Sequence, residues 1–198
     1  MYNYSTDWIY KLENQRHWMH YWHQLNMLFS HLSEGDRILE IGVGTRFTSN
    51  YLKSKGYHLT TIDIDAKKKP DIVANIVDYD FPDVFDYIIA FEVFEHILFD
   101  DFQNLISRLQ KVFTKKMIMS VPRNEKVWLD FQCIFPGEKT IAFQIATKRN
   151  KILSKHHHWE IDYAHYSRSF LKGIFSDSNL KIESVKKSNS LVYYTLSK

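Results

Sequence analysis

The chain has few cysteines, glycines and prolines, and it has no long apolar run. Its single cysteine, Cys133, excludes an internal disulfide and favours a reducing compartment. No stretch approaches the roughly 18 apolar residues of a membrane-spanning helix, and the N-terminus lacks a secretory pattern. Basic residues number 26 and acidic residues 23, so charge gives no argument for nucleic acid. We therefore expect a cytoplasmic protein without a membrane or nucleic-acid partner.

Two of the six glycines, Gly42 and Gly44, stand one residue apart directly after an apolar strand at 37–41. Gly42 would let the chain turn sharply, and Gly44 would let the backbone approach a ligand closely. A helix over about 47–55 would follow, and the free N–H groups at its start favour an anionic or carboxylate-bearing ligand. The pattern predicts a nucleotide-type binding turn.

The third position of the glycine pattern helps to decide which nucleotide is bound. A dinucleotide fingerprint is G-x-G-x-x-G/A, whose third small residue lets the helix pack close to the strand. That position is Phe47, which is far too large, so an NAD-linked oxidoreductase is disfavoured. Instead, Glu40 and Asp63 would stand at the carboxyl ends of neighbouring parallel strands, where open α/β sheets bind ligands.

Around this turn the chain resembles the class I S-adenosylmethionine-dependent methyltransferases. Five segments match that family in the expected order, which is far more specific than one glycine turn. They are Ile38–Thr45, Thr61–Asp65, Asp71–Ile76 with Phe81-Pro82, Phe85–His96 and Met117–Pro122. A late segment, His158–Ile161, is similar to a bacterial and archaeal branch whose substrates are poorly defined.

The resemblance implies that the cofactor is S-adenosylmethionine and suggests which residues hold it. From the methionine end to the adenine, the implied residues are Glu40, Gly42, Gly44, Thr45, Phe91, Glu92, Asp63, Ile64, Asn75 and Ile76. Asp63 would accept hydrogen bonds from both ribose hydroxyls, because a carboxylate offers paired acceptors. Asn75 and the Ile76 backbone would meet the adenine.

Two residues depart from the family pattern. Arg46 stands where a third glycine is usual, and Asn75 stands where an aspartate is usual. Asn75 can still hydrogen-bond an adenine amino group. Arg46 leaves three alternatives open: a bidentate pair with the cofactor's carboxylate, a solvent-facing side chain, or impaired cofactor binding.

Several side chains could act on the methyl acceptor, for example by taking a proton from it. The candidates are His158, Glu160, His96 and Tyr163. A histidine near its ordinary pKa can take a proton from a hydroxyl acceptor. For His96, bonding to backbone groups at the start of the following segment is the plainer alternative.

The histidine cluster has a second interpretation as a metal site. Its competent ligands are His156, His158, Glu160, Asp162 and His165. Their spacing matches no known closed site, and Cys133 stands alone. We therefore predict no metal.

The implied fold class is α/β, a Rossmann-like three-layer sandwich. Its mostly parallel seven-stranded sheet would end in an antiparallel C-terminal edge hairpin. We expect a single domain over 1–198, with a helical cap at 1–34, a cofactor-binding half at 35–122, and an acceptor-side insertion with the C-terminal strands at 123–198.

Three segments predict local departures from the plain α/β pattern. Residues 7–32 predict one long amphipathic helix or two shorter ones, packed on the sheet or serving as a lid over the site. The apolar side chains at helical spacing are Trp8, Leu12, Met19, Trp22, Leu25, Phe29 and Leu32. Only Ala66–Pro70 separate the second and third strands, so the usual crossover helix should be absent. Val127–Phe135 and Lys139–Thr147, around Pro136-Gly137, predict a β-hairpin insertion beside the acceptor.

We therefore expect a methyltransferase acting on an O- or N-acceptor of a small molecule or a glycan-type metabolite. The alternative is a non-catalytic cofactor-binding or scaffold protein of the same fold, in which Arg46 and Asn75 mark decay of the site. The aromatic hairpin would suit a homodimer surface. Nucleic-acid methylation lacks its N/D-P-P-Y/F tetrapeptide, because Phe91–Phe94 stands in that place.

Overall fold

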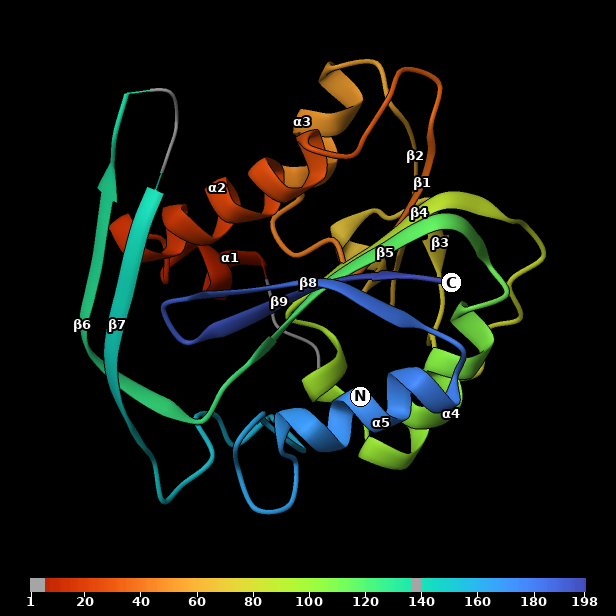
Figure 1. Ribbon diagram of the computed structural model, residues 1–198. Helices are drawn as coiled ribbons and strands as arrows, with labels where there is room; N and C mark the ends of the chain where they lie inside the picture. The colour runs from red at the N-terminus through yellow and green to blue at the C-terminus, as the bar shows by residue number, and fades with distance from the viewer. Residues whose placement is uncertain (1–5, 137–139) are drawn as a thin grey trace.

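A computed structural model describes residues 6–136 and 140–198. Seven strands form one sheet in the order β3-β2-β1-β4-β5-β9-β8 (Figure 1). The parallel strands are β1 (Arg37–Ile41), β2 (His58–Asp63), β3 (Ile72–Val73), β4 (Phe85–Phe91) and β5 (Phe113–Pro122). The antiparallel edge is formed by β8 (Lys181–Ser188) and β9 (Leu191–Ser197). The predicted sheet is confirmed.

Helices cover both faces of this sheet and complete the predicted three layers (Figure 1). The helices of one face are α2 (Gln15–Phe29) and α3 (Phe47–Ser54), and those of the other are α4 (Phe99–Leu109) and α5 (Arg168–Asp177). Neighbouring residues of a strand point to opposite faces. Accordingly, Ile38 packs in the cluster of Leu28 and Leu52, whereas Leu39 packs in the cluster of Phe102. Among the described residues, no helix has the length and apolar character needed to cross a membrane.

The N-terminal segment forms two helices, which is one of the two arrangements predicted. α1 (Thr6–Tyr10) is followed by a short break and then by α2. The new helix begins there because the Asn14 side chain accepts a hydrogen bond from the N–H of His17 at 3.1 Å.

The apolar side chains expected to face the core from α2 are largely turned outward. Trp22 and Phe29 are 44% and 41% exposed, whereas Tyr21 and Gln24 are buried. Part of this inward face lines a cavity, through Tyr21 and Gln24, instead of packing in the apolar core, so polar groups are accommodated there. The apolar spacing chosen from the sequence therefore predicted the wrong face, and the buried apolar residues of α2 are Met27 and Leu28 instead.

The link between β2 and β3 has no α-helix, as predicted. It holds a single 3₁₀ turn, η1 (Ala66–Lys68), and β3 itself is only two residues long. A second 3₁₀ turn, η2 (Phe94–His96), follows β4. Both turns lie just past the carboxyl ends of parallel strands.

The predicted insertion after β5 is a hairpin of β6 (Glu125–Ile134) and β7 (Thr140–Lys148), which forms its own two-stranded sheet. Of its predicted Pro136-Gly137 turn, Gly137 lies outside the described residues. One face of the hairpin exposes Leu129, Phe131, Ile141, Phe143 and Ile145. Cys133 lies in β6 and is partly buried.

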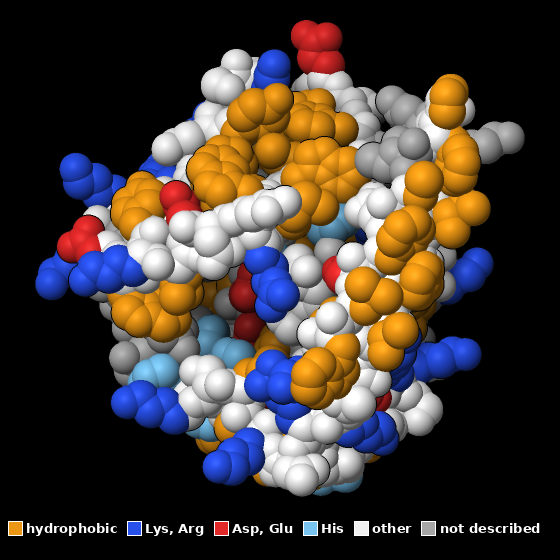
Figure 2. Space-filling view, turned by 90° about the vertical axis from the view of Figure 1, so that its left-hand side faces the viewer, with side chains coloured by type: hydrophobic (Ala, Val, Ile, Leu, Met, Phe, Trp, Pro, Cys, Tyr) orange, Lys and Arg blue, Asp and Glu red, His pale blue; other side chains and the backbone are white. Residues whose placement is uncertain are grey.

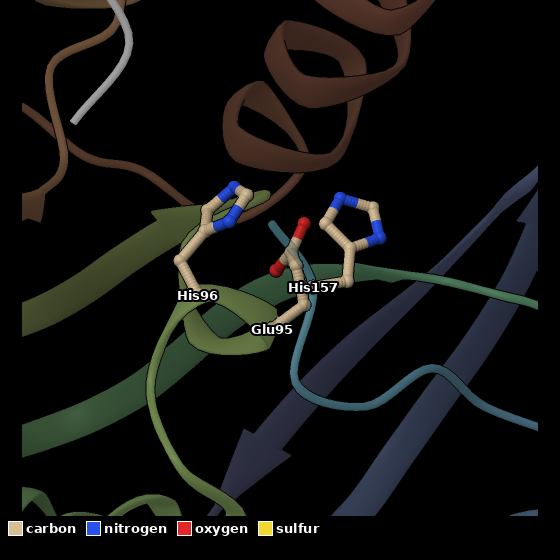
Figure 3. A group of neighbouring side chains, drawn as sticks. All are labelled: Glu95, His96 and His157. Carbon is tan, nitrogen blue, oxygen red and sulfur yellow. The ribbon is translucent and has the colours of Figure 1, made fainter. Parts of the chain in front are cut away.

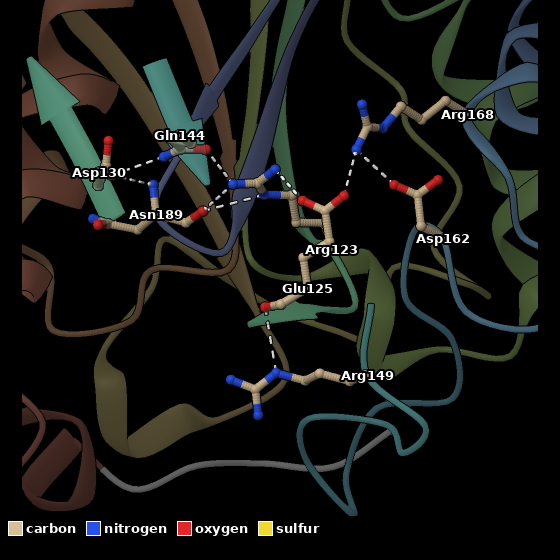
Figure 4. A network of polar contacts seen from close by, with 8 residues as sticks. All are labelled: Arg123, Glu125, Asp130, Gln144, Arg149, Asp162, Arg168 and Asn189. Atoms are coloured by element: carbon tan, nitrogen blue, oxygen red, sulfur yellow. Dashed lines mark hydrogen bonds and ion pairs between the residues drawn. The ribbon is translucent and has the colours of Figure 1, made fainter. Parts of the chain in front are cut away.

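A buried arginine joins the hairpin to the main sheet (Figure 4). Arg123 is 2% exposed and donates to the carbonyl of Asn189, in the turn between β8 and β9, at 3.1 Å from Nε. It also bonds Glu125 of β6 and Gln144 of β7. These contacts fix the base of the hairpin against the sheet edge.

Trp159 is the largest fully buried side chain among the described residues, and its Nε1–H donates to the carbonyl of Phe94 at 3.1 Å. Trp159→Phe should lower the free energy of unfolding by about 1–3 kcal/mol, because it leaves a buried carbonyl without its donor. Urea denaturation measures this loss. Trp128→Phe is the control, since Trp128 donates a similar bond to Thr147 while 63% exposed. Equal effects in both variants would contradict the structural role of Trp159.

Candidate active site

The turn after β1 has the backbone that its glycines predicted. Gly42 and Gly44 have φ values of 77° and 52°, in the left-handed region that favours glycine. A Cβ added to Gly42 would lie 2.4 Å from Cγ2 of Val93, whereas one added to Gly44 would meet open space. Gly42 is thus required by packing, and Gly44 borders a cavity.

Arg46 also has a left-handed backbone, with φ of 65°, which explains the glycine that the family usually carries here. Its side chain donates to the carbonyls of Lys68, at 2.9 Å, and Lys69. Arg46 therefore anchors the η1 turn, and it lines neither of the two cavities at this end of the sheet.

Glu40 lies at the end of β1 and is 4% exposed. The Ser49 hydroxyl of α3 donates a hydrogen bond to its carboxylate. Burial raises the pKa of Glu40 from 4.5 to about 7, and the Ser49 bond opposes that rise. The carboxyl group thus titrates near neutrality and would favour a positively charged partner.

Asp63 ends β2, and its carboxylate organises the surrounding backbone. Oδ2 accepts the N–H of Val43 at 3.0 Å, and Oδ1 accepts the N–H of Asp65 at 2.9 Å. Nζ of Lys68 lies 3.3 Å from Oδ2 in a buried ion pair. A carboxylate has about four lone-pair positions, so Asp63 retains acceptor capacity for a ligand.

Of the two residues expected at the adenine, Ile76 lines a cavity and Asn75 does not. The Asn75 side chain accepts the N–H of Val77 at 3.2 Å and donates to Asp78 at 2.7 Å, forming a local turn. Asn75 lines neither cavity, whereas Ile76 lines the smaller one.

Two adjoining cavities lie at the carboxyl ends of the parallel strands. The larger has a volume of about 230 Å³ and the smaller about 110 Å³. Residues common to both are Ile9, Gly42, Gly44, Phe91, Glu92 and His96. Figure 2 shows this side of the molecule hollowed, with acidic and histidine side chains toward the floor.

The sequence-predicted cofactor residues divide between these cavities. Glu40 and Thr45 line the larger one, and Asp63 and Ile64 line the smaller one. The Thr45 hydroxyl lies 3.0 Å from the hydroxyl of Tyr21, which joins the turn to α2. Side chains of α1 and α2 form part of the larger cavity's wall, so the N-terminal helices cover part of this cavity.

Three polar side chains, two from the η2 turn and one from the late histidine segment, line another part of the larger cavity. Glu95, His96 and His157 point toward one another there, and each offers one atom within 4.8 Å of the others (Figure 3). Nδ1 of His96 lies 3.1 Å from the carbonyl of His156. Burial lowers the pKa of His96 to about 4, so its imidazole is neutral at pH 7.

Glu95 is 1% exposed, and burial raises the pKa of its carboxyl group well above the ordinary value, with the nearby charge of Glu92 adding to the rise. Its Oε2 is buried, and no hydrogen bond from the described residues reaches it. The surrounding protein therefore favours the protonated carboxyl group over the carboxylate.

Near the late His-Trp-Glu segment, the histidine that lines the site is His157 and not His158, which the sequence had suggested. His158 is exposed and lines neither cavity, although its N–H donates to the carbonyl of Glu95 at 2.8 Å. His157 lines the larger cavity instead. The two histidines are adjacent and of one residue type, so the backbone hydrogen bond of His158 to the η2 turn decides which side chain points inward.

Glu160 lies behind the cavity rather than in it. It is fully buried, and its Oε1 lies 2.6 Å from Nδ1 of His157. The N–H of Leu153 and the side chain of Asn124 donate to the same carboxylate at 2.6 Å each. Glu160 thus positions His157.

The ligand set considered from the sequence is not assembled. Asp162 bonds Arg168 at 2.6 Å, and Glu160 makes the contacts just described. Within residues 6–136 and 140–198, the group of histidines and acids that could hold a metal is Glu95, His96 and His157. Similarly, none of the described residues of the β6–β7 hairpin lines either cavity, although the hairpin was expected beside the acceptor.

Comparison with known proteins identifies the family. Residues 12–185 match a family model described as a methyltransferase domain. No curated protein matches the chain. The fold is shared with an S-adenosylmethionine-dependent methyltransferase from Mesorhizobium loti, at 12% identity, over 87% of this chain and 96% of that chain, with a TM-score of 0.59.

Two further solved structures share the fold at similarly low identity. One is the glycopeptide N-methyltransferase MtfA complexed with S-adenosyl-L-methionine, at 10% identity, over 87% of this chain and 91% of that chain, with a TM-score of 0.56. The other is the Burkholderia thailandensis 1,6-didemethyltoxoflavin-N1-methyltransferase, at 12% identity, over 86% of this chain and 73% of that chain, with a TM-score of 0.54.

The sheet order, the glycine turn and the two acidic strand ends define a class I methyltransferase. Because the family model covers most of its length, the chain belongs to the methyltransferase domain family. It is an enzyme whose cofactor is S-adenosylmethionine.

The raised pKa of Glu40 predicts a pH-dependent stability. The folded protein keeps the Glu40 proton up to about pH 7, whereas the unfolded chain loses it near 4.5, so stability falls as pH rises through this window. Glu40→Gln removes the titration. Relative to wild type, the variant should therefore gain about 2–3 kcal/mol between pH 4.5 and pH 8. Urea denaturation of both proteins across this range measures the gain, and a constant difference would contradict a raised pKa.

Proposed function

We propose that the enzyme methylates a hydroxyl or amine group of a small, partly apolar molecule. The observation that carries this proposal is the larger cavity, whose walls include both Glu40 with the glycine turn and the Glu95–His96–His157 group. We call the part lined by the latter group the acceptor side. Apolar side chains complete the walls, from Trp8, Ile9, Leu12, Phe47 and Phe91. Such walls favour a partly apolar acceptor over a glycan-type one.

The cofactor's parts are assigned by the chemistry of the cavity walls. Glu40 would accept a hydrogen bond from the ammonium group of the cofactor's methionine part. The N–H groups of the Gly42–Thr45 turn would donate hydrogen bonds to the carboxylate of that methionine part. Asp63 would accept a hydrogen bond from one ribose hydroxyl through its remaining lone-pair position. Ile64 and Ile76 would flank the adenine, while the Asn75 amide stays in its local turn with Asp78.

These residues fit the cofactor without rearrangement of the turn. The left-handed backbone at Gly44 leaves open space where a side chain would stand, and Phe91 and Glu92 border both cavities. Arg46 and Asn75, which raised the alternative of a decayed site, both bond within the protein and leave the cavities clear.

S-adenosylmethionine supplies an electrophilic methyl group on a positively charged sulfur. The lone pair of the acceptor atom would form the new bond to the methyl carbon as the carbon–sulfur bond breaks, which would leave S-adenosylhomocysteine, and the acceptor's proton would pass to solvent. His96 and His157 would hold the protic group of the acceptor in line for this displacement. Glu160 would act through His157 as a positioning residue.

This proposal predicts different effects for two adjacent histidines. His157→Gln should lower methyl transfer by about 100-fold or more, because its side chain lines the acceptor side of the cavity. His158→Gln should have a much smaller effect, since His158 is exposed. The measurement is transfer of a deuterated methyl group from S-adenosylmethionine to a panel of small phenols, alcohols and amines, followed by mass spectrometry.

Two controls make the result decisive. Calorimetry with S-adenosylhomocysteine should give similar affinities for both variants and wild type, because neither histidine is among the residues assigned to the cofactor: His157 lines the acceptor side of the larger cavity, and His158 lines neither cavity. A larger loss of transfer in His158→Gln than in His157→Gln would favour the assignment made from the sequence alone. Cofactor binding without transfer to any member of the panel would count against a small-molecule acceptor.

A further inference from the structure

Three side chains at the acceptor side of the larger cavity have the composition of a metal centre. Glu95, His96 and His157 supply two imidazoles and one carboxylate, a ligand set found in catalytic zinc sites. Their ligand atoms lie within 4.8 Å of one another, and Figure 3 shows the carboxylate between the two rings. Because the set has three protein ligands, a bound ion would keep a position open for another molecule.

The two segments that carry these ligands are fixed to each other by hydrogen bonds. The N–H of His158 donates to the carbonyl of Glu95 at 2.8 Å, and Nε1 of Trp159 donates to the carbonyl of Phe94 at 3.1 Å. The rings of His96 and His157 lie 5.1 Å apart between centroids. The ligands are therefore held close together before any ion binds.

The outer contacts of both imidazoles are those typical of metal-bound histidines. Nδ1 of His157 lies 2.6 Å from the Glu160 carboxylate, and Nδ1 of His96 lies 3.1 Å from the carbonyl of His156. Histidines that bind a metal usually donate their second ring N–H to a carboxylate or a carbonyl, which fixes the tautomer. Coordination through Nε2 of both rings would preserve both contacts.

Glu95 provides an independent indication of a missing partner. Its side chain is 1% exposed, and its buried Oε2 receives no hydrogen bond from the described residues. Leaving a buried carboxyl oxygen without a partner costs stability. A cation among the three side chains would satisfy that oxygen.

We propose that Glu95, His96 and His157 bind a divalent cation of the zinc type, and that this ion coordinates the acceptor's oxygen. The inference rests on the proposed function and narrows it to a hydroxyl acceptor. Coordination lowers the pKa of the hydroxyl, so its proton passes to solvent and the oxygen is held as an anion. An oxygen lone pair then forms the oxygen–carbon bond as the carbon–sulfur bond of the cofactor breaks.

The test uses the full chain without a histidine tag, stripped of metal by a chelator. Titration with Co²⁺ should produce a saturable visible absorption band at one ion per chain, and Zn²⁺ should abolish it. Calorimetry with Zn²⁺ alone should show that His157→Gln and Glu95→Gln weaken binding by about 10-fold or more. Circular dichroism shows whether each variant is folded, and His157→Gln carries the test if Glu95→Gln is not.

His158→Gln is the matched control, because it removes an adjacent exposed histidine and leaves the three ligands in place. It should bind Zn²⁺ as the wild type does. An absent Co²⁺ band, or equal Zn²⁺ affinity in the His157→Gln variant and the wild type, would overturn the metal site. Binding of S-adenosylhomocysteine to the metal-free protein is measured separately, so a metal site can fail while the methyltransferase assignment stands, and the reverse.

Discussion

The site depends on the contact between Asp63 and the backbone of the glycine turn. Its carboxylate ends β2, and it accepts the N–H of Val43, between Gly42 and Gly44, at 3.0 Å. This bond ties together the ends of two parallel strands at the point where both cavities open. Asp63 is therefore a structural residue of the turn, and we propose that it also recognises the ribose of the cofactor.

The parts that could be predicted from the sequence are those set by short-range patterns. The β1 strand has the bounds expected from its apolar run, and Phe47 begins α3 directly after the turn. The five-residue gap before Asp71 was too short for a crossover helix, and only η1 fits there. Gly42 and Gly44 marked the turn because few other residues adopt its backbone.

The parts that could not be predicted depend on contacts between distant segments. His157 and His158 are equivalent as sequence, and the backbone bond to Glu95 in a turn about sixty residues earlier in the chain decides between them. Tyr21 and Gln24 lie on the inward face of α2, where they line the larger cavity, so hydrophobic spacing pointed to the opposite side. Arg46 reaches the η1 carbonyls, a contact that no local pattern specifies.

Binding of the cofactor to the two cavities is the central claim, and calorimetry with S-adenosylhomocysteine tests it most directly. The wild type should bind at micromolar concentrations. Asp63→Asn should weaken binding by at least about 10-fold, because an amide loses part of the acceptor capacity that the ribose and the turn require. Equal affinity in the two proteins, or no binding by the wild type up to millimolar concentrations, would contradict this account of the site.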